Sequence, residues 1–142
     1  GDGAKREELE AGKRERGLTA LDIRGRLPDE EAFPLLARAE VAINPQTQSS
    51  LQEASSPVKL FYYAALGAPM VVTSGPSVAG ELREAGAAEV VAPSGPFASR
   101  VAAVLGDDER RATMSKTTSE LAPKWNWHQR ATSLAELYES RG

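Results

Sequence analysis

The chain contains no cysteine and a single histidine, His128, among its 142 residues. Without a thiol, disulfides and thiolate chemistry are excluded, and the composition is compatible with a reducing compartment. A single histidine excludes a metal site built from a histidine cluster. Functions that need a disulfide, a reactive thiolate or a metal site made of several histidines are therefore excluded.

The sequence also lacks a strong charge of one sign and a long apolar run. Its formal net charge is −3, so no basic field attracts nucleic acid or an anionic membrane, and no nucleic-acid partner is expected. No apolar stretch reaches the length of a membrane span, and no signal peptide is visible. Neither G-x-G-x-x-G after a predicted strand nor G-x-x-x-x-G-K-[ST] occurs. The common dinucleotide and P-loop sites therefore lack their motifs.

What the sequence does contain is a regular alternation of apolar strands and amphipathic helices. With 41% hydrophobic residues, a chain of this length can form one domain with a real core. We expect strands over residues 20–27, 39–45, 68–74 and 88–94. We expect helices over residues 2–17, 28–40, 57–67, 77–86, 96–108, 109–121 and 123–140. Asp2 is expected to cap the first helix, and Leu134, Leu137 and Tyr138 form one apolar stripe on the last.

The predicted strands are apolar throughout rather than alternating, which is typical of strands covered on both faces. They predict a Rossmann-like α/β fold, with a parallel sheet, helices on both faces and right-handed crossovers. In such sheets ligands bind beyond the carboxyl ends of the strands. The candidate surface is therefore made by the loops after Leu27, Asn44, Thr73 and Pro93.

One helix start within this surface has the features of an anion site. Pro57 suits the first turn of the helix over residues 57–67, and the N–H groups of a first turn lack partners inside the helix. Ser55 and Ser56 add hydroxyls, and Lys59 adds a positive charge where the helix end is already positive. An arriving phosphate would neutralise both. The alternative is that Lys59 is solvated and Ser56 only caps the helix.

Other polar groups have simpler explanations. The acidic pairs Glu30/Glu31 and Asp107/Asp108 sit at helix starts, where carboxylates cap and complement the helix dipole. His128 follows two nearby tryptophans, a setting that favours a packing or surface role over catalysis. No catalytic residue is therefore assigned.

The order of several segments resembles the C-terminal half of group 1 (family 4) glycosyltransferases. The segments that carry the resemblance are "GDGAKREELE", "GRLPDEEAFPLLARAEVAINP", "SSPVKLFYYAALGAPMVV", "VAGELREAGAAEVVAP" and "WNWHQRATSLAELYES". Enzymes of this family have the GT-B fold and transfer sugars from nucleotide donors with retention. The resemblance runs over nearly the whole chain, and the ordered set is fairly specific.

The resemblance implies a donor-binding site. The donor diphosphate would lie at the start of the helix over residues 57–66, against Ser55, Ser56, Pro57, Val58 and Lys59. The base would lie near Arg26, Leu27 and Pro28. The family's ribose-binding glutamate falls on Tyr62, whose phenol cannot offer the bidentate acceptance of a carboxylate. Its earlier glutamate falls near Ala54, with Glu53 adjacent.

From the resemblance we expect the donor-binding half of a retaining glycosyltransferase, cytoplasmic and active in polysaccharide biosynthesis. The donor is a nucleotide-diphosphate sugar, the acceptor is unknown, and neither a metal nor a cofactor is expected. The alternative is a degenerate, non-catalytic relative kept for binding or protein contacts, as Tyr62 would suggest.

We also expect residues 1–142 to be one domain of a longer protein. The N-terminal acceptor domain and the first strand of this domain would precede Gly1, so the chain alone would be inactive. Peripheral membrane association through the absent domain and self-association through an exposed sheet edge stay open as partner hypotheses.

Overall fold

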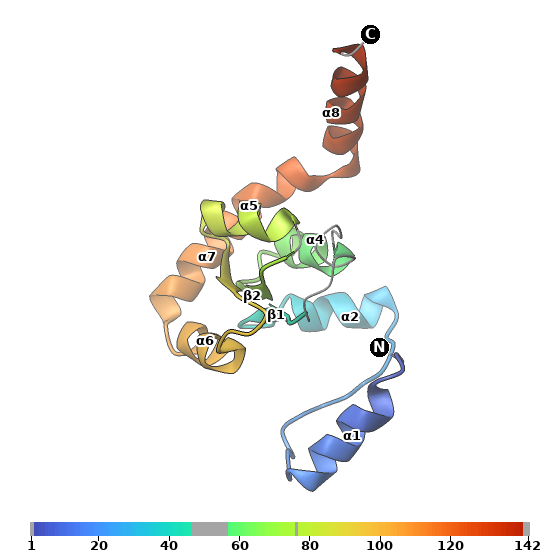
Figure 1. The fold of residues 1–142 in the computed structure, drawn as a ribbon, viewed down its shortest axis with the longest axis vertical. Coiled ribbons are helices and arrows are strands. Elements are labelled where there is room, and N and C mark those ends of the chain that lie inside the picture. Colours follow the sequence, from blue (N-terminus) through green and yellow to red (C-terminus); the bar gives the residue numbers. More distant parts are fainter. Residues whose placement is uncertain (1, 47–56, 76, 141–142) are drawn as a thin grey trace. The chain divides into compact units, whose positions relative to one another are not determined.

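The computed structural model describes residues 2–46, 57–75 and 77–140. The chain divides into two compact units, Gly1–Leu35 and Leu36–Gly142, and each is described by itself (Figure 1). The second unit contains the sheet and most of the buried core.

The first unit contains helix α1, Arg6–Glu15, and most of helix α2, Asp29–Leu36. Both helices have acidic residues in their first turns, which complements the helix dipole. α2 continues through Pro34, although proline removes one intrahelical hydrogen bond. Both helices were predicted, with longer bounds than they have.

The predicted strand over residues 20–27 is wrong, because this described segment forms turns and irregular backbone. A strand needs a neighbouring ladder, and here Gly25 instead adopts a φ of 74°, outside the range of extended backbone. The N–H of Arg26 donates to the Asp2 carboxylate at 3.2 Å rather than to a strand. The predicted role of Asp2 as a helix cap is also wrong, because the N-cap position is Lys5 and has no side-chain cap.

The second unit is built on a three-stranded parallel sheet in the order β1-β2-β3. Its strands are β1, Ala42–Asn44, β2, Met70–Thr73, and β3, Ala88–Val91. Helix α4, Val58–Ala65, connects β1 to β2, and helix α5, Ser77–Ala85, connects β2 to β3. The prediction of an α/β fold with a parallel sheet is confirmed, with three of the four expected strands.

The residues of β2 alternate between two buried clusters, one on each face of the sheet. Met70 and Val72 pack with Leu60 of α4 and with buried residues of α5. Val71 packs on the other face with Val104 of helix α6, Phe97–Leu105. α4 and α5 therefore cover one face and α6 covers the other (Figure 1).

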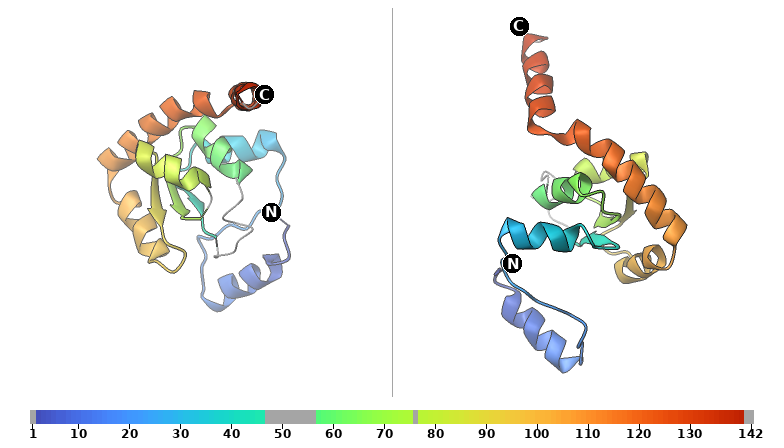
Figure 2. Two further views of the ribbon diagram at one scale, coloured as in Figure 1. Left: turned by 45° about the horizontal axis from the view of Figure 1, so that its top comes forward. Right: turned by 180° about the vertical axis from the view of Figure 1, so that it is seen from behind.

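Helix α7, Asp108–Leu121, follows α6 and runs past the sheet, as the views in Figure 2 show. The Ser115 hydroxyl donates to the carbonyl of Gly67 at 2.7 Å, and the Thr118 hydroxyl lies 3.3 Å from the carbonyl of Ala87. Both carbonyls belong to segments that lead into a strand. α7 therefore closes the amino edge of the sheet, the edge at which the parallel strands begin.

The predicted helix over residues 123–140 is broken into a short 3-10 turn, η1, Ala122–Trp125, and helix α8, Trp127–Glu139. Asn126 is extended between them, and its carboxamide oxygen accepts from the Gln129 N–H at 2.8 Å, capping α8. The apolar stripe of Leu134, Leu137 and Tyr138 is 53%, 47% and 72% exposed. Among the described residues, no helix combines the length and the apolar character that crossing a membrane requires.

Candidate functional site

The candidate site lies at the carboxyl edge of the sheet, where β1, β2 and β3 end at Asn44, Thr73 and Val91. Helix α4 leads from the end of β1 to the start of β2, and the two strands are parallel. The helix must therefore begin at the carboxyl edge and run back to the amino edge. This topology places the first turn of α4, with Lys59, at the edge where such folds bind ligands.

The first turn of α4 has no cap from its own side chains. The N-cap residue is Pro57, which makes no side-chain cap hydrogen bond, and the first turn contains no acidic residue. The Leu60 N–H donates to the Pro57 carbonyl at 3.0 Å, whereas no described residue accepts from the N–H of Val58 or Lys59. Within the described residues these two donors are available to an anion.

The Lys59 side chain is exposed, and no described carboxylate forms an ion pair with it. A lysine in a first turn adds a full charge to the partial positive charge of the helix end, which is unfavourable without an anion. Together, the two N–H groups that no described residue bonds and the ammonium are chemically suited to bind a phosphate or diphosphate. That they do so stays a prediction.

The structure gives less information on the predicted serines and on Tyr62. Ser55 and Ser56 lie outside the described residues, as does the position of the expected earlier glutamate near Ala54. Tyr62 lies one turn after Val58 on α4 and is 43% exposed. Its predicted contact with a ribose is untested.

Arg26 and Leu27, the predicted contacts of the base, belong to the first unit. The Asp2 carboxylate holds this segment, because it accepts from the Arg26 N–H and also pairs with the Arg6 guanidinium. These hydrogen bonds, the one from Arg26 first, hold the pKa of Asp2 below its usual value. A Cβ at Gly25 would lie 2.5 Å from the Arg6 guanidinium, so glycine fits the close approach. A role of Arg26 and Leu27 in binding a base stays a prediction.

Asn44 is a polar residue of the carboxyl edge to which the sequence alone assigned no role. Its side chain is fully buried, and neither its Nδ2 nor its Oδ1 has a hydrogen-bond partner among the residues that the structure describes. The side-chain oxygen of Gln46 is also buried, with no partner in the described part of the chain. An unsatisfied buried polar group costs about 1–3 kcal/mol, so these amides call for an explanation. The available signal was a carboxamide ending the otherwise apolar run "VAIN".

Thr73 fixes the backbone around these amides. Its hydroxyl accepts from the Gln46 N–H at 2.9 Å and lies 3.3 Å from the Asn44 carbonyl. The ends of β1 and β2 are thereby joined just where the strands stop. The two carboxamides therefore start from backbone that is hydrogen-bonded to β2. Within the described part of the chain, both polar atoms of the Asn44 carboxamide and the oxygen of the Gln46 carboxamide have no partner.

The comparison with known families adds to this geometry. A family model described as "Glycosyl transferase-like" matches residues 7–136. The chain belongs to the glycosyl transferase-like family. The match spans most of this glycosyl transferase-like domain and confirms the resemblance found in the ordered segments. No curated protein matches the chain.

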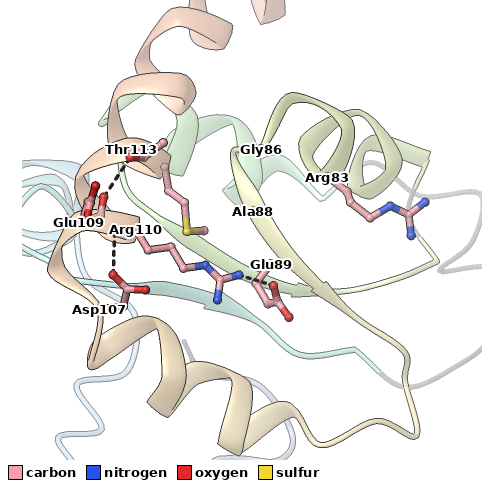
Figure 3. A pocket seen from close by; sticks show the side chains of 9 residues that line it. Arg83, Gly86, Ala88, Glu89, Asp107, Glu109, Arg110 and Thr113 are labelled. Carbon is pink, nitrogen blue, oxygen red and sulfur yellow. Dashed lines mark hydrogen bonds and ion pairs between the residues drawn. The ribbon is translucent and has the colours of Figure 1, made fainter.

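The glycosyl transferase-like domain also has a cleft of about 530 Å³ at its amino edge, beside the start of β3 (Figure 3). Three of its charged residues, Glu89, Asp107 and Arg110, bond within the domain. Glu89 lies between Arg110, at 2.5 Å, and Arg100, at 3.6 Å. The Asp107 carboxylate accepts from the Arg110 N–H at 2.9 Å and caps α7, as predicted. These ion pairs hold β3 and α7 together. Because Glu89 already pairs with the two arginines, the cleft is a weaker candidate for an anion-binding site than the carboxyl edge.

No group of three or more potential metal-ligating side chains is found among the residues that the structure describes. The polar groups that the described residues offer at the carboxyl edge include N–H groups, an ammonium and carboxamides. They can donate hydrogen bonds and bind negative charge.

Proposed function

We propose that the domain is the donor-binding half of a retaining glycosyltransferase, in which residues 1–142 bind a nucleotide-diphosphate sugar. Membership of the glycosyl transferase-like family supports the class of reaction. The observation that carries the assignment of the site is the first turn of α4 at the carboxyl edge, where no described residue caps the helix or pairs with Lys59. A diphosphate is the anion that such donors offer.

In this reaction the bond between the anomeric carbon of the sugar and a diphosphate oxygen breaks, and the anomeric carbon forms a bond to an acceptor hydroxyl oxygen. The nucleoside diphosphate leaves with increased negative charge. The N–H groups of Val58 and Lys59, with the Lys59 ammonium, would stabilise that charge from fixed positions. Such preorganised electrostatic stabilisation often contributes more to catalysis than any other single effect. Groups that bind and deprotonate the acceptor would belong to a domain outside this chain.

The test is calorimetric titration of the chain with uridine, guanosine and adenosine diphosphates. A hydrogen bond to a charged group contributes about 1.5–3 kcal/mol, so Lys59→Ala should weaken the diphosphate that binds by about tenfold to a hundredfold. Lys116→Ala is the matched control, because Lys116 is an exposed lysine of α7. Equal affinities of the Lys59→Ala variant and the unsubstituted chain would exclude the lysine from the site.

Tyr62 supports a second candidate function, a degenerate relative that binds donors weakly and does not catalyse transfer. The resemblance places a ribose-binding glutamate at this position. We expect Tyr62→Glu to tighten binding of the ribonucleoside diphosphate but not of its 2′,3′-dideoxy analogue, because only the former offers a diol to the carboxylate. If the substitution tightens neither, the position does not face a ribose in this chain.

A further inference from the structure

The direction of the Asn44 side chain follows from the sheet. Asn44 pairs in register with Val72, and paired residues of adjacent strands project to the same face. Val72 packs in the cluster that contains Leu60 of α4 and Val78 of α5, and these two residues lie in the first turns of their helices. The Asn44 carboxamide therefore lies on the face of the sheet covered by α4 and α5, at the edge where both helices begin.

Gln46 extends this feature. Gln46 follows Asn44 by two residues, and the bond from its N–H to the Thr73 hydroxyl holds this segment against the end of β2. The unused atoms are the carboxamide nitrogen of Asn44 and the side-chain oxygens of Asn44 and Gln46. This set both donates and accepts hydrogen bonds, and it carries no charge.

We propose that the carboxamides of Asn44 and Gln46 bind hydroxyl groups of the sugar carried by the donor. This inference rests on the proposed donor-binding function. A hydroxyl both donates and accepts, and so satisfies both polar atoms of a carboxamide. A diphosphate only accepts, and the N–H groups of α4 with Lys59 already suit it.

The chain offers a direct spectroscopic test, because it contains only two asparagines, Asn44 and Asn126. Labelling asparagine with ¹⁵N gives two pairs of side-chain NH₂ signals. Asn126 is the internal control, because its carboxamide already bonds Pro123 and Gln129 at the start of α8. We expect the diphosphate sugar to shift the Asn44 signals, while the diphosphate alone leaves them in place and neither ligand shifts those of Asn126.

Substitutions give an independent measurement by titration with the same two ligands. Loss of a neutral hydrogen bond corresponds to about a three- to tenfold change in affinity. Asn44→Leu should weaken the diphosphate sugar by this factor and change the affinity for the diphosphate less than twofold. Thr118→Val is the matched control, a buried polar-to-apolar change at the amino edge, and should alter neither affinity. If Asn44→Leu does not fold, Gln46→Leu makes the same comparison at a half-buried position.

The outcomes separate this inference from the proposed function. If neither ligand binds the unsubstituted chain, or if Lys59→Ala does not weaken the diphosphate, the proposed function fails and the inference fails with it. If both ligands bind through Lys59 but the Asn44 signals do not move, the carboxamide holds a buried water only, and the inference alone is overturned. Equal shifts of the Asn44 signals with both ligands would place the carboxamide against the nucleotide or the diphosphate, and would also overturn it.

Discussion

The two edges of the sheet differ in how their polar groups are satisfied. At the amino edge, Ser115 of α7 donates to the segment before β2, the Thr118 hydroxyl bonds Met114 and lies against the segment before β3, and Glu89 lies between two arginines. At the carboxyl edge, none of the described residues caps the first turn of α4 or bonds the buried Asn44 carboxamide. Both edges belong to one unit and share one core, so the difference is not one of packing quality.

This contrast separates residues that stabilise the fold from residues that are available for binding. Where buried polar groups bond one another, removing one of them costs stability. Where they have no partner in the protein, they lower stability unless a ligand or water uses them. The amino edge should therefore respond to substitution with a change in folding, and the carboxyl edge with a change in ligand binding.

The largest effect on stability is expected at Gly67, where α4 ends next to the amino edge. Its φ is 64°, and a Cβ there would lie 2.5 Å from the Ser119 hydroxyl of α7. The left-handed backbone alone costs a residue with a Cβ about 1–2 kcal/mol, and the contact with α7 adds to this. Gly67→Ala should therefore lower the free energy of unfolding in urea by about 2 kcal/mol or more. A change below about 0.5 kcal/mol would mean that α7 does not hold the amino edge as described.

A paired comparison of Thr118→Val and Asn44→Leu tests the contrast itself. Both positions are fully buried. Thr118 makes hydrogen bonds, so its substitution should lower the free energy of unfolding by about 1 kcal/mol. Asn44 makes none with the side chain to any described residue, so Asn44→Leu should leave the free energy unchanged or raise it by up to about 1 kcal/mol. A clear loss of stability in Asn44→Leu would show that the carboxamide has a structural partner and would remove the contrast.

The smallest effect is expected at Tyr63, which ties α4 to β1. Its hydroxyl donates to the Ile43 carbonyl at 3.4 Å, and burial raises the pKa of Tyr63 above its ordinary value of 10.0. A raised pKa means that the folded state favours the neutral phenol. The contribution to stability is therefore complete below about pH 10 and is lost as the pH rises through the raised pKa.

Tyr63→Phe should cost less than about 1 kcal/mol at neutral pH, because the hydrogen bond is long. Between pH 9 and pH 11, roughly one unit on either side of the ordinary pKa, the stability of the unsubstituted chain should fall further than that of the variant. Thermal unfolding measured across this range checks the difference. Parallel curves for the two proteins would show that the phenol is not buried in the folded state.

Much of the second unit could be predicted from the sequence because its signals are local. Apolar runs marked β1, β2 and β3, Gly67 and Gly86 marked the ends of α4 and α5, and Asp107 marked the start of α7. The start of α4 could be placed at the carboxyl edge because parallel connectivity leaves no alternative. Helix caps and strand patterns depend on a few neighbouring residues, so they can be read along one chain.

The errors arose where distant residues decide the structure. The segment over residues 20–27 is apolar enough for a strand, but Asp2 takes the Arg26 N–H and Gly25 turns the backbone. Likewise, a sequence cannot show that Asn44 lacks a partner, because its burial depends on the elements packed around the end of β1. The side-chain carboxamides of Asn44 and Gln46 were therefore recognised as part of the candidate site only from the structure.

One measurement tests the central claim most directly: a titration of the ¹⁵N-labelled chain with a nucleoside diphosphate, followed at the backbone amides of both edges. If the start of α4 binds the diphosphate, the largest shifts will be those of the Val58 and Lys59 amides, and the Ser115 and Thr118 amides of α7 will not move. Shifts that gather on α7 around the amino-edge cleft, with Val58 and Lys59 unchanged, would contradict the account.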